Sequence, residues 1–165
     1  MDKYYYLVAQ LPMLSFGRES AMGVDSFLNE ARKWMSAADF QILLATDIHS
    51  TERRGAEPGV LTDFKQFEHK MRIEVVEWRK ARKLGQEYKP GLFPVALVKE
   101  GNPLQVEKKQ MEFLWKYIEE LETGHHFDLE VLILYFLKLQ LLARLESFNK
   151  EVGMQKFKHI TEIGL

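Results

Sequence analysis

The longest patterned segment of the chain is residues 127–148, FDLEVLILYFLKLQLLARLESF, in which apolar side chains recur at steps of three and four. Two sets follow this spacing, Leu132, Tyr135, Phe136, Leu139 and Leu142 on one face and Leu134, Leu137, Leu141, Leu145 and Phe148 on another. A helix that is apolar on two faces has to be covered by neighbours on both. The pattern therefore predicts an all-α bundle with this helix, at about 128–150, in its centre.

Two further segments, 62–84 and 104–123, each carry a single apolar stripe and are predicted to pack against the central helix. The stripes are Phe64, Phe67, Met71, Val75 and Trp78 in the first segment and Met111, Leu114, Ile118 and Leu121 in the second. We expect Thr62 or Asp63 to cap the first helix and Gly85 to follow its last residue.

Shorter helices are predicted in the N-terminal third of the chain. Residues 4–11 are apolar and end at a proline, and in an otherwise helical chain they favour a short helix over a strand without partners. Asp25 is expected to cap a helix over 26–35, and Ser36 to cap a helix that starts again at residue 37.

Capping signals also divide the C-terminal third. Gly124 is expected to end the helix before the central one, and Asp128 to cap the central helix itself. Gly153 is expected to end the central helix, and 154–162 to form a separate short helix.

The chain is expected to be a single helical domain over 1–165 with two flexible connections. Residues 50–60 are polar and contain two glycines and a proline, and residues 86–103 contain three of the five prolines. Within the second connection, residues 95–98 are apolar and are expected to dock on the core.

Composition excludes several classes of protein. The net charge of −1 gives no overall attraction to nucleic acid or to an anionic membrane, and the absence of cysteine excludes disulfides and thiolate metal sites. The N-terminus lacks the features of a signal peptide, and the longest apolar run, 131–137, is too short to span a membrane. We therefore expect a cytoplasmic protein that reaches the inner membrane only as a peripheral protein, through partner subunits.

No motif of catalysis or of cofactor binding is found. The five histidines do not form HExxH, and there is no phosphate-binding glycine loop and no GxSxG elbow. His125 and His126 are a weak metal signal that fits two half-exposed histidines in a turn better. We expect no enzyme, no cofactor and no metal; the alternative is a small helical enzyme or ligand-binding domain with a pocket under 86–103.

The residues that remain are candidates for contact with a partner. Four basic residues, Arg79, Lys80, Arg82 and Lys83, lie at the end of the 62–84 helix. Glutamates interleave the basic residues of this helix, which favours a solvated face or an acidic protein partner over nucleic acid; a nucleic-acid-binding regulator is a third alternative.

Aromatic residues, at 12% of the chain, are too numerous to be all in the core, and any left exposed would be interface anchors. Trp115, just off the seam of its helix, is the candidate we single out. Arg144, on the central helix, is expected to pair with an acidic residue of a neighbouring helix.

Two segments, Tyr4–Leu14 and Phe127–Ile160, resemble the opening and the close of a poorly characterised bacterial family encoded among V-type ATPase genes. The second is also similar to the end of a repeat unit in the V/A-type ATPase C subunit, whose eukaryotic equivalent is the d subunit, with matches at Phe127, Asp128, Tyr135, Arg144, Glu151 and Gly153. Ser36–Phe40, followed by two leucines, resembles the short-helix corner of the same fold. The resemblance covers roughly 60 residues, and members of both groups are longer than this chain.

What the resemblance implies is a non-catalytic assembly or adaptor protein. The C subunit is an all-helical funnel without an active site that links the membrane rotor ring to the central stalk. By analogy, the expected partners are V-type ATPase subunits of the central stalk and the membrane rotor ring, with a role in proton or sodium transport and none in binding nucleic acid.

Overall fold

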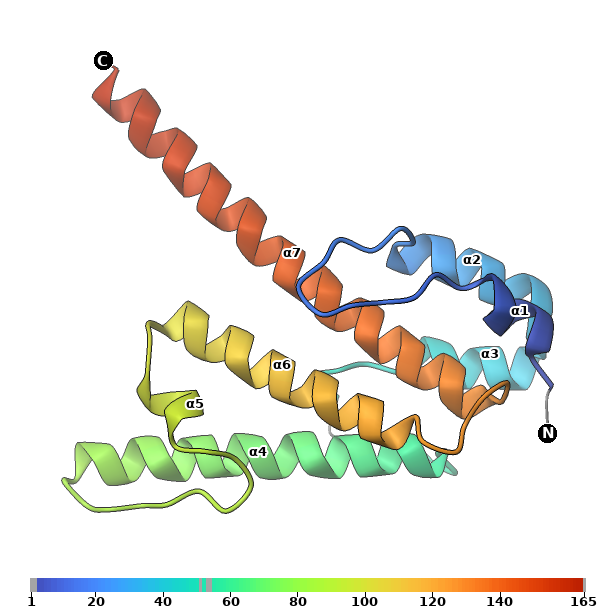
Figure 1. Cartoon of the computed structure of the whole chain (residues 1–165), viewed down its shortest axis with the longest axis horizontal. Helices are drawn as coiled ribbons and strands as arrows, with labels where there is room; N and C mark the ends of the chain where they lie inside the picture. The colour runs from blue at the N-terminus through green and yellow to red at the C-terminus, as the bar shows by residue number, and fades with distance from the viewer. Residues whose placement is uncertain (1–2, 51, 53–54, 165) are drawn as a thin grey trace.

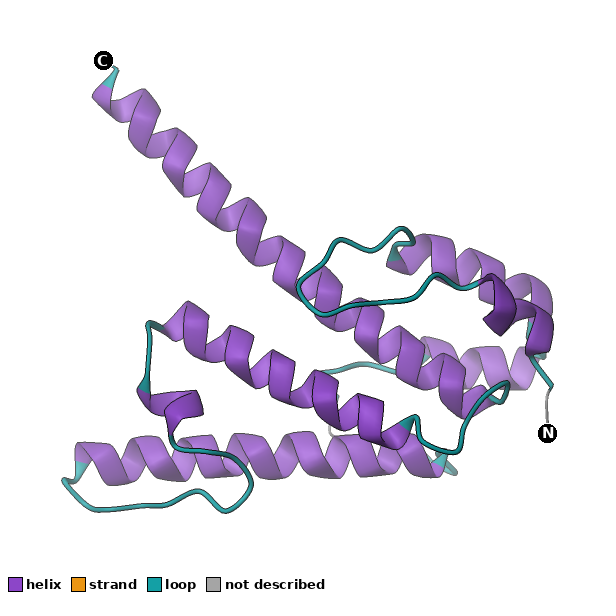
Figure 2. Ribbon diagram, in the orientation of Figure 1, coloured by secondary structure: helices purple, strands orange, loops and turns teal. Residues whose placement is uncertain are grey.

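The computed structural model describes residues 3–50, 52 and 55–164, without the side chains of residues 150–153 and 155–156, and in this part of the chain every regular element is a helix (Figure 2). The prediction of an all-α bundle is confirmed. The predicted loop at 50–60 is described only in part, because residues 51, 53 and 54 lie outside the described residues.

The central helix is α7, Leu129–Ile163, and four other helices contact it: α2, α3, α4 and α6 (Figure 1). Burial along its first five turns follows the two predicted faces, with Leu132, Leu134 and Leu137 wholly enclosed. Asp128 caps this helix as expected, since its carboxylate accepts a hydrogen bond from the Val131 N–H at 3.0 Å. The two-sided apolar pattern therefore corresponds to a helix covered on both sides.

The predicted long partners are α4, Gly59–Lys83, and α6, Pro103–Leu121. The expected cap of α4 at Thr62 or Asp63 is wrong, because the helix begins three residues earlier after Pro58, where Val60 and Leu61 are buried. A longer buried stripe, rather than a capping side chain, sets this start.

The end of α4 follows the prediction. Gly85 has φ +67, and the N–H groups of Gly85 and Gln86 bond back to the carbonyls of Arg82 and Ala81. This is the Schellman arrangement, which needs a residue that tolerates positive φ after the last helical turn.

The N-terminal third folds as α1, Tyr5–Gln10, α2, Val24–Trp34, and α3, Ala37–Leu44. The corner between α2 and α3 is the predicted one, because the Ser36 side chain accepts a hydrogen bond from the Asp39 N–H. The expected cap of α2 is wrong: the N-cap is Gly23, and Asp25 lies inside the first turn, where its charge complements the positive end of the helix dipole.

The connection from α4 to α6 is tied to the bundle. The Glu74 carboxylate accepts hydrogen bonds from the N–H groups of Gly91 and Leu92, at 3.2 and 2.9 Å. The expected docking of residues 95–98 is confirmed by the short helix α5, Ala96–Lys99, in which Leu97 and Val98 are buried.

The predicted stop at Gly153 is wrong, and so is the separate helix at 154–162. Helix α7 continues through Gly153 to Ile163 and projects from the bundle towards the C-terminus (Figure 1). A glycine ends a helix where the chain takes positive φ, whereas Gly153 lies inside the continuous helix α7. No helix in the described part of the chain combines the length and the apolarity of a membrane span.

Candidate interaction surface

Trp115, the predicted interface anchor, is buried and only 3% exposed. Its ring packs against Phe16 with a centroid separation of 5.6 Å, and its Nε1–H donates to the Glu119 carboxylate. Trp115 lies outside the predicted seam and is nevertheless buried, because the loop that carries Phe16 covers α6 on a second side. Trp115 is therefore a core residue, and the expectation that it serves as an exposed anchor is wrong.

The four basic residues at the end of α4 are all exposed to solvent; they are Arg79, Lys80, Arg82 and Lys83. Lys80 pairs with Glu77 at 3.5 Å, and the Arg82 guanidinium lies 5.3 Å from the centre of the Trp78 ring. At about 100° per residue, the four side chains spread over about 160° of the helix circumference. They form a broad solvated face rather than a converging site for one phosphate.

Exposed aromatic rings gather instead where α1 meets the end of α2. Tyr5, Tyr6 and Trp34 are 51%, 68% and 47% exposed. Tyr6 stacks on Trp34 with ring centroids 6.0 Å apart, and Tyr5 contacts both Tyr6 and Phe127. We call Tyr5, Tyr6, Trp34 and Phe127 the aromatic surface.

By helical spacing, Trp34 lies on the same side of α2 as Phe27 and Ala31. Those two are enclosed, but Trp34 is the last residue of α2 and lies beyond the edge of the core. The exposure of Tyr5 and Tyr6 could have been predicted from the sequence, because three consecutive tyrosines on a helix point in three directions and cannot all face one core.

The aromatic surface is held by contacts from Tyr4, which is buried. The Tyr4 N–H donates to the Phe127 carbonyl at 2.8 Å, and its hydroxyl donates to the Asp39 carboxylate. Lys3 also pairs with Asp39, at 2.8 Å. These hydrogen bonds from Lys3 and then from Tyr4 hold the pKa of Asp39 below its usual value. The contacts join α1, the α2–α3 corner and the start of α7 into one unit.

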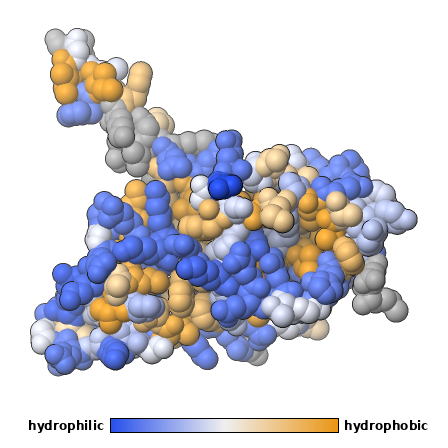
Figure 3. Space-filling view, viewed as in Figure 1, coloured by the Kyte–Doolittle hydropathy of each residue, from blue (hydrophilic) through white to orange (hydrophobic). Residues whose placement is uncertain are grey.

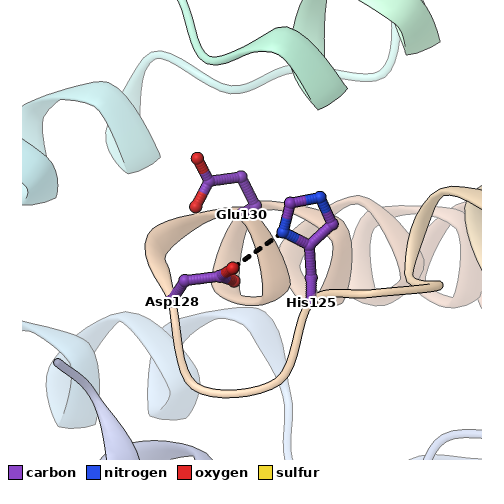
Figure 4. Close-up of side chains that lie close together, drawn as sticks. All are labelled: His125, Asp128 and Glu130. Atoms are coloured by element: carbon purple, nitrogen blue, oxygen red, sulfur yellow. Dashed lines mark hydrogen bonds and ion pairs between the residues drawn. The ribbon is translucent and has the colours of Figure 1, made fainter. Parts of the chain in front are cut away.

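Next to this unit, His125, Asp128 and Glu130 bring possible metal-ligand atoms within 4.8 Å of one another (Figure 4). Burial raises the pKa of Asp128, but hydrogen bonds from His125, at 2.7 Å, and from the Val131 N–H outweigh it and lower the pKa overall. Both Asp128 oxygens are thus engaged, and the positive end of α7 disfavours a cation here. The cluster is explained as the cap of the helix.

The hollows of the described surface include two grooves beside α7. The larger, of about 700 Å³, lies between the loop 16–26 and residues 139–149 of α7. The smaller, of about 320 Å³, lies between α4, α6 and α7, and Arg72, Arg79 and Arg144 line it. Arg144 pairs with Glu107 of α6 at 3.2 Å, as expected, and Arg72 pairs with Glu68.

The space under 86–103, where the alternative of an enzyme placed a pocket, is occupied by side chains of the connection itself. Phe93, Leu97 and Val98 are buried there and belong to the core. Of the two grooves described above, the smaller touches this connection only at its last residue, Pro103, and the larger does not touch it.

Comparison with known proteins finds no matching family model, no matching curated protein and no matching solved structure.

Proposed function

We propose that the chain is a non-catalytic assembly protein that binds subunits of a V-type ATPase, with the aromatic surface as its contact. The observation that carries this proposal is the aromatic surface itself, where the large rings of Tyr5, Tyr6 and Trp34 remain exposed to solvent. Tyrosine and tryptophan are the residue types most enriched among the anchors of protein interfaces.

The geometry of the rings suits an anchor. Tyr6 and Trp34 are already stacked, so little side-chain freedom is lost when a partner covers them. The helix termini and hydrogen bonds around Tyr4 fix the backbone below them. A rigid platform of this kind binds with less loss of entropy than exposed rings on a loop.

The choice of partner rests on the resemblance, and the fold supports it in one respect. The segments that carry the resemblance, 4–14, 36–44 and 127–160, lie far apart in sequence but contact one another around Tyr4. The Tyr135 hydroxyl also donates to the Pro12 carbonyl at 2.8 Å. In this proposal the chain acts in the cytoplasm, between the central stalk and the membrane rotor ring, and serves proton or sodium transport only through those partners.

The alternatives have less support. The buried residues under 86–103 leave the proposed enzyme pocket filled. A nucleic-acid-binding regulator would use Arg79, Lys80, Arg82 and Lys83, and its binding would weaken steeply with salt. Binding through apolar rings would depend much less on salt.

The test is retention of purified V-type ATPase from the same organism by the tagged full chain. We expect the wild-type chain to retain stalk or ring subunits, and the Tyr6→Ala and Trp34→Ala variants to bind about 30-fold more weakly, since hot-spot truncations cost about 2 kcal/mol. Tyr88→Ala is the matched control, because Tyr88 lies in the connection after α4 and outside the aromatic surface.

Circular dichroism spectra would confirm that the variants fold. If the wild-type chain retains no ATPase subunit, the proposed partner is wrong. If subunits are retained equally by wild type and both variants, the aromatic surface is not the contact.

A further inference from the structure

The end of α7 exposes a row of large apolar side chains. Met154, Phe157, Ile160 and Ile163 recur every three residues and are between 63% and 71% exposed. Figure 3 shows hydrophobic residues at the end of the projecting helix, away from the body of the molecule. Single exposed apolar residues are common on proteins, but these four lie within about two and a half turns of one helix, spread over about 180° of its circumference, and form a patch that indicates a contact.

The same helix also forms one wall of the larger groove. Leu139, Leu142 and Leu145, each no more than 9% exposed, line this groove from α7, and Phe16, Met22 and Val24 line it from the segment 16–26. The groove of about 700 Å³ is large enough to take several side chains. The apolar side chains on both walls suit an apolar helix face, and the charged residues that also line the groove, among them Arg18, Glu19 and Lys108, suit the polar flanks of such a helix.

Helical geometry places the two features on the same side of α7. Ile160 follows Leu142 by about five full turns, at about 3.6 residues each, so the two side chains point in the same direction. In the same way, Phe157 matches Leu139 and Ile163 matches Leu145. Beyond the bundle, Phe157, Ile160 and Ile163 therefore continue the face of the helix that lines the groove, whereas Met154 points about 120° away from Ile160.

We propose that the chain forms a two-fold symmetric antiparallel dimer, in which the C-terminal end of each α7 lies in the larger groove of the other copy. With the symmetry axis midway between Leu142 and Ile160, Ile160 meets Leu142 of the partner subunit. Phe157 then lies at the level of Leu145 of the partner subunit, and Ile163 at the level of Leu139 of the partner subunit. Because the axis is two-fold, every contact is made twice.

The covalent geometry of α7 requires a second molecule. Ile160 and Leu142 are separated by about 27 Å along one continuous helix, at about 1.5 Å per residue. The tip cannot return to its own groove without breaking that helix. A second copy brings the two features together in the same register at both ends.

The crossing point is suited to close approach. Asn149 and Gly153 lie on the same side of α7 as Leu142, since both are within about 20° of it on a helical wheel. Glycine at a crossing lets two helix backbones come closer than any other residue does. The glycine that was expected to stop the helix therefore has a position in the dimer.

The area is sufficient for a stable dimer. Four side chains of this size, each about two-thirds exposed, present on the order of 500 Å² per tip. Counting the exposed part of the groove walls and both copies, the interface buries on the order of 1,400 Å², which lies within the range of stable protein interfaces.

The first test is the mass of the full chain over a concentration series, by sedimentation equilibrium. We expect a dimer in the wild type, and a dissociation constant raised at least about a hundredfold in Ile160→Glu, because a carboxylate would be buried twice in each dimer. Lys158→Glu is the matched control: Lys158 is on the same turn but points about 160° away, and the dimer should remain. A wild-type chain that stays monomeric at every concentration overturns the proposal, and so does an Ile160→Glu dimer as stable as the wild type.

The second test determines the relative direction of the two helices by disulfide cross-linking. The chain has no cysteine, so only the introduced cysteines can react. An Ile160→Cys chain mixed with a Leu142→Cys chain should form a disulfide-linked heterodimer on mild oxidation. In the antiparallel register the two copies of position 160 are about 27 Å apart, so Ile160→Cys alone should not cross-link. Cross-linking of Ile160→Cys with itself would indicate parallel tips and overturn the arrangement. These tests do not involve ATPase subunits, so they are independent of the proposed function.

Discussion

Lys138 is a buried cation in the third turn of α7, and mutations of Lys138 and of its acidic partner should have unequal effects on stability. Its Nζ lies 2.8 Å from a carboxylate oxygen of Glu122 and 5.1 Å from the centre of the Trp115 ring. The Lys138 side chain is 9% exposed, whereas that of Glu122 is 33% exposed. Removal of the carboxylate strands a charge inside the protein, while removal of the ammonium leaves a carboxylate that water can reach.

The magnitudes follow from this difference. Breaking a buried ion pair by removing one partner costs about 3–5 kcal/mol, and the partial exposure of Glu122 places this pair near the lower end. Two effects reduce the cost of Glu122→Gln: the retained contact with the Trp115 ring, and the loss of a negative charge at the C-terminal end of α6, worth about 0.5 kcal/mol. We therefore expect Glu122→Gln to lower the free energy of unfolding by about 2 kcal/mol. Lys138→Met replaces the buried charge by an apolar chain of similar volume and should be neutral to within about 1 kcal/mol.

Urea unfolding followed by circular dichroism measures the free energy of unfolding of both variants, and thermal unfolding measures their Tm. For a chain of this size, about 2 kcal/mol corresponds to a fall in Tm of about 4–8 °C. Glu120→Gln is the control, because Glu120 is exposed near the end of the same helix and should change stability by less than about 0.5 kcal/mol. Equal destabilisation by Glu122→Gln and Lys138→Met would refute the reasoning, since it would mean that the pair, rather than the stranded charge, determines the cost.

Two further predictions concern polar groups on the central helix. Burial raises the pKa of Tyr135 to about 12, so the folded state keeps the phenol proton when the unfolded state loses it near pH 10. The stability of the wild type should fall as pH rises from about 10 towards 12, and its advantage over Tyr135→Phe in urea unfolding should shrink over that range; a constant advantage would contradict the shift. Gln140 accepts from the Ile48 N–H at 2.9 Å and donates to the Thr46 carbonyl at 2.8 Å. Gln140→Leu leaves both groups without this partner and should lower the free energy of unfolding by about 2 kcal/mol in thermal or urea unfolding. The control Gln41→Leu, at an exposed position, should be nearly neutral. Equal effects of the two mutations would indicate that water replaces the Gln140 amide.

The fold was predictable where the signal is local or periodic. Two apolar faces on 128–150 required two covering layers, and the structure has them. Ser36 and Asp128 were recognisable as caps because a side-chain oxygen has to lie a fixed number of residues before the N–H that it accepts from. Gly85 was recognisable because positive φ is needed after the last turn. Starts of helices without such a side chain, as at Gly59, were misplaced.

The type of residue at the candidate surface was predictable from the sequence, but the individual residues were not. Composition indicated that some aromatic residues would be exposed, but the exposed ones are Tyr5, Tyr6 and Trp34, and Trp115 is buried. The difference lies in contacts distant in sequence: Phe16, far from Trp115 in the chain, covers it. Helical periodicity reports which residues share a face, and it carries no information on which loop covers that face.

Helix α7 depends both on local helical signals and on contacts between residues distant in sequence. An isolated helix as short as the projecting end would be marginal in water, because nucleation of a helix is unfavourable and a glycine in its interior costs about 1 kcal/mol. Here nucleation is already provided by 129–149, which the bundle holds, so each further residue needs only to extend an existing helix. That extension keeps Ile160 in phase with Leu142, and any break at Gly153 would destroy the phase. The continuity of the helix through this glycine is therefore the condition on which an antiparallel dimer depends, and burial of the tip in such a dimer would in turn stabilise the helix that the glycine weakens.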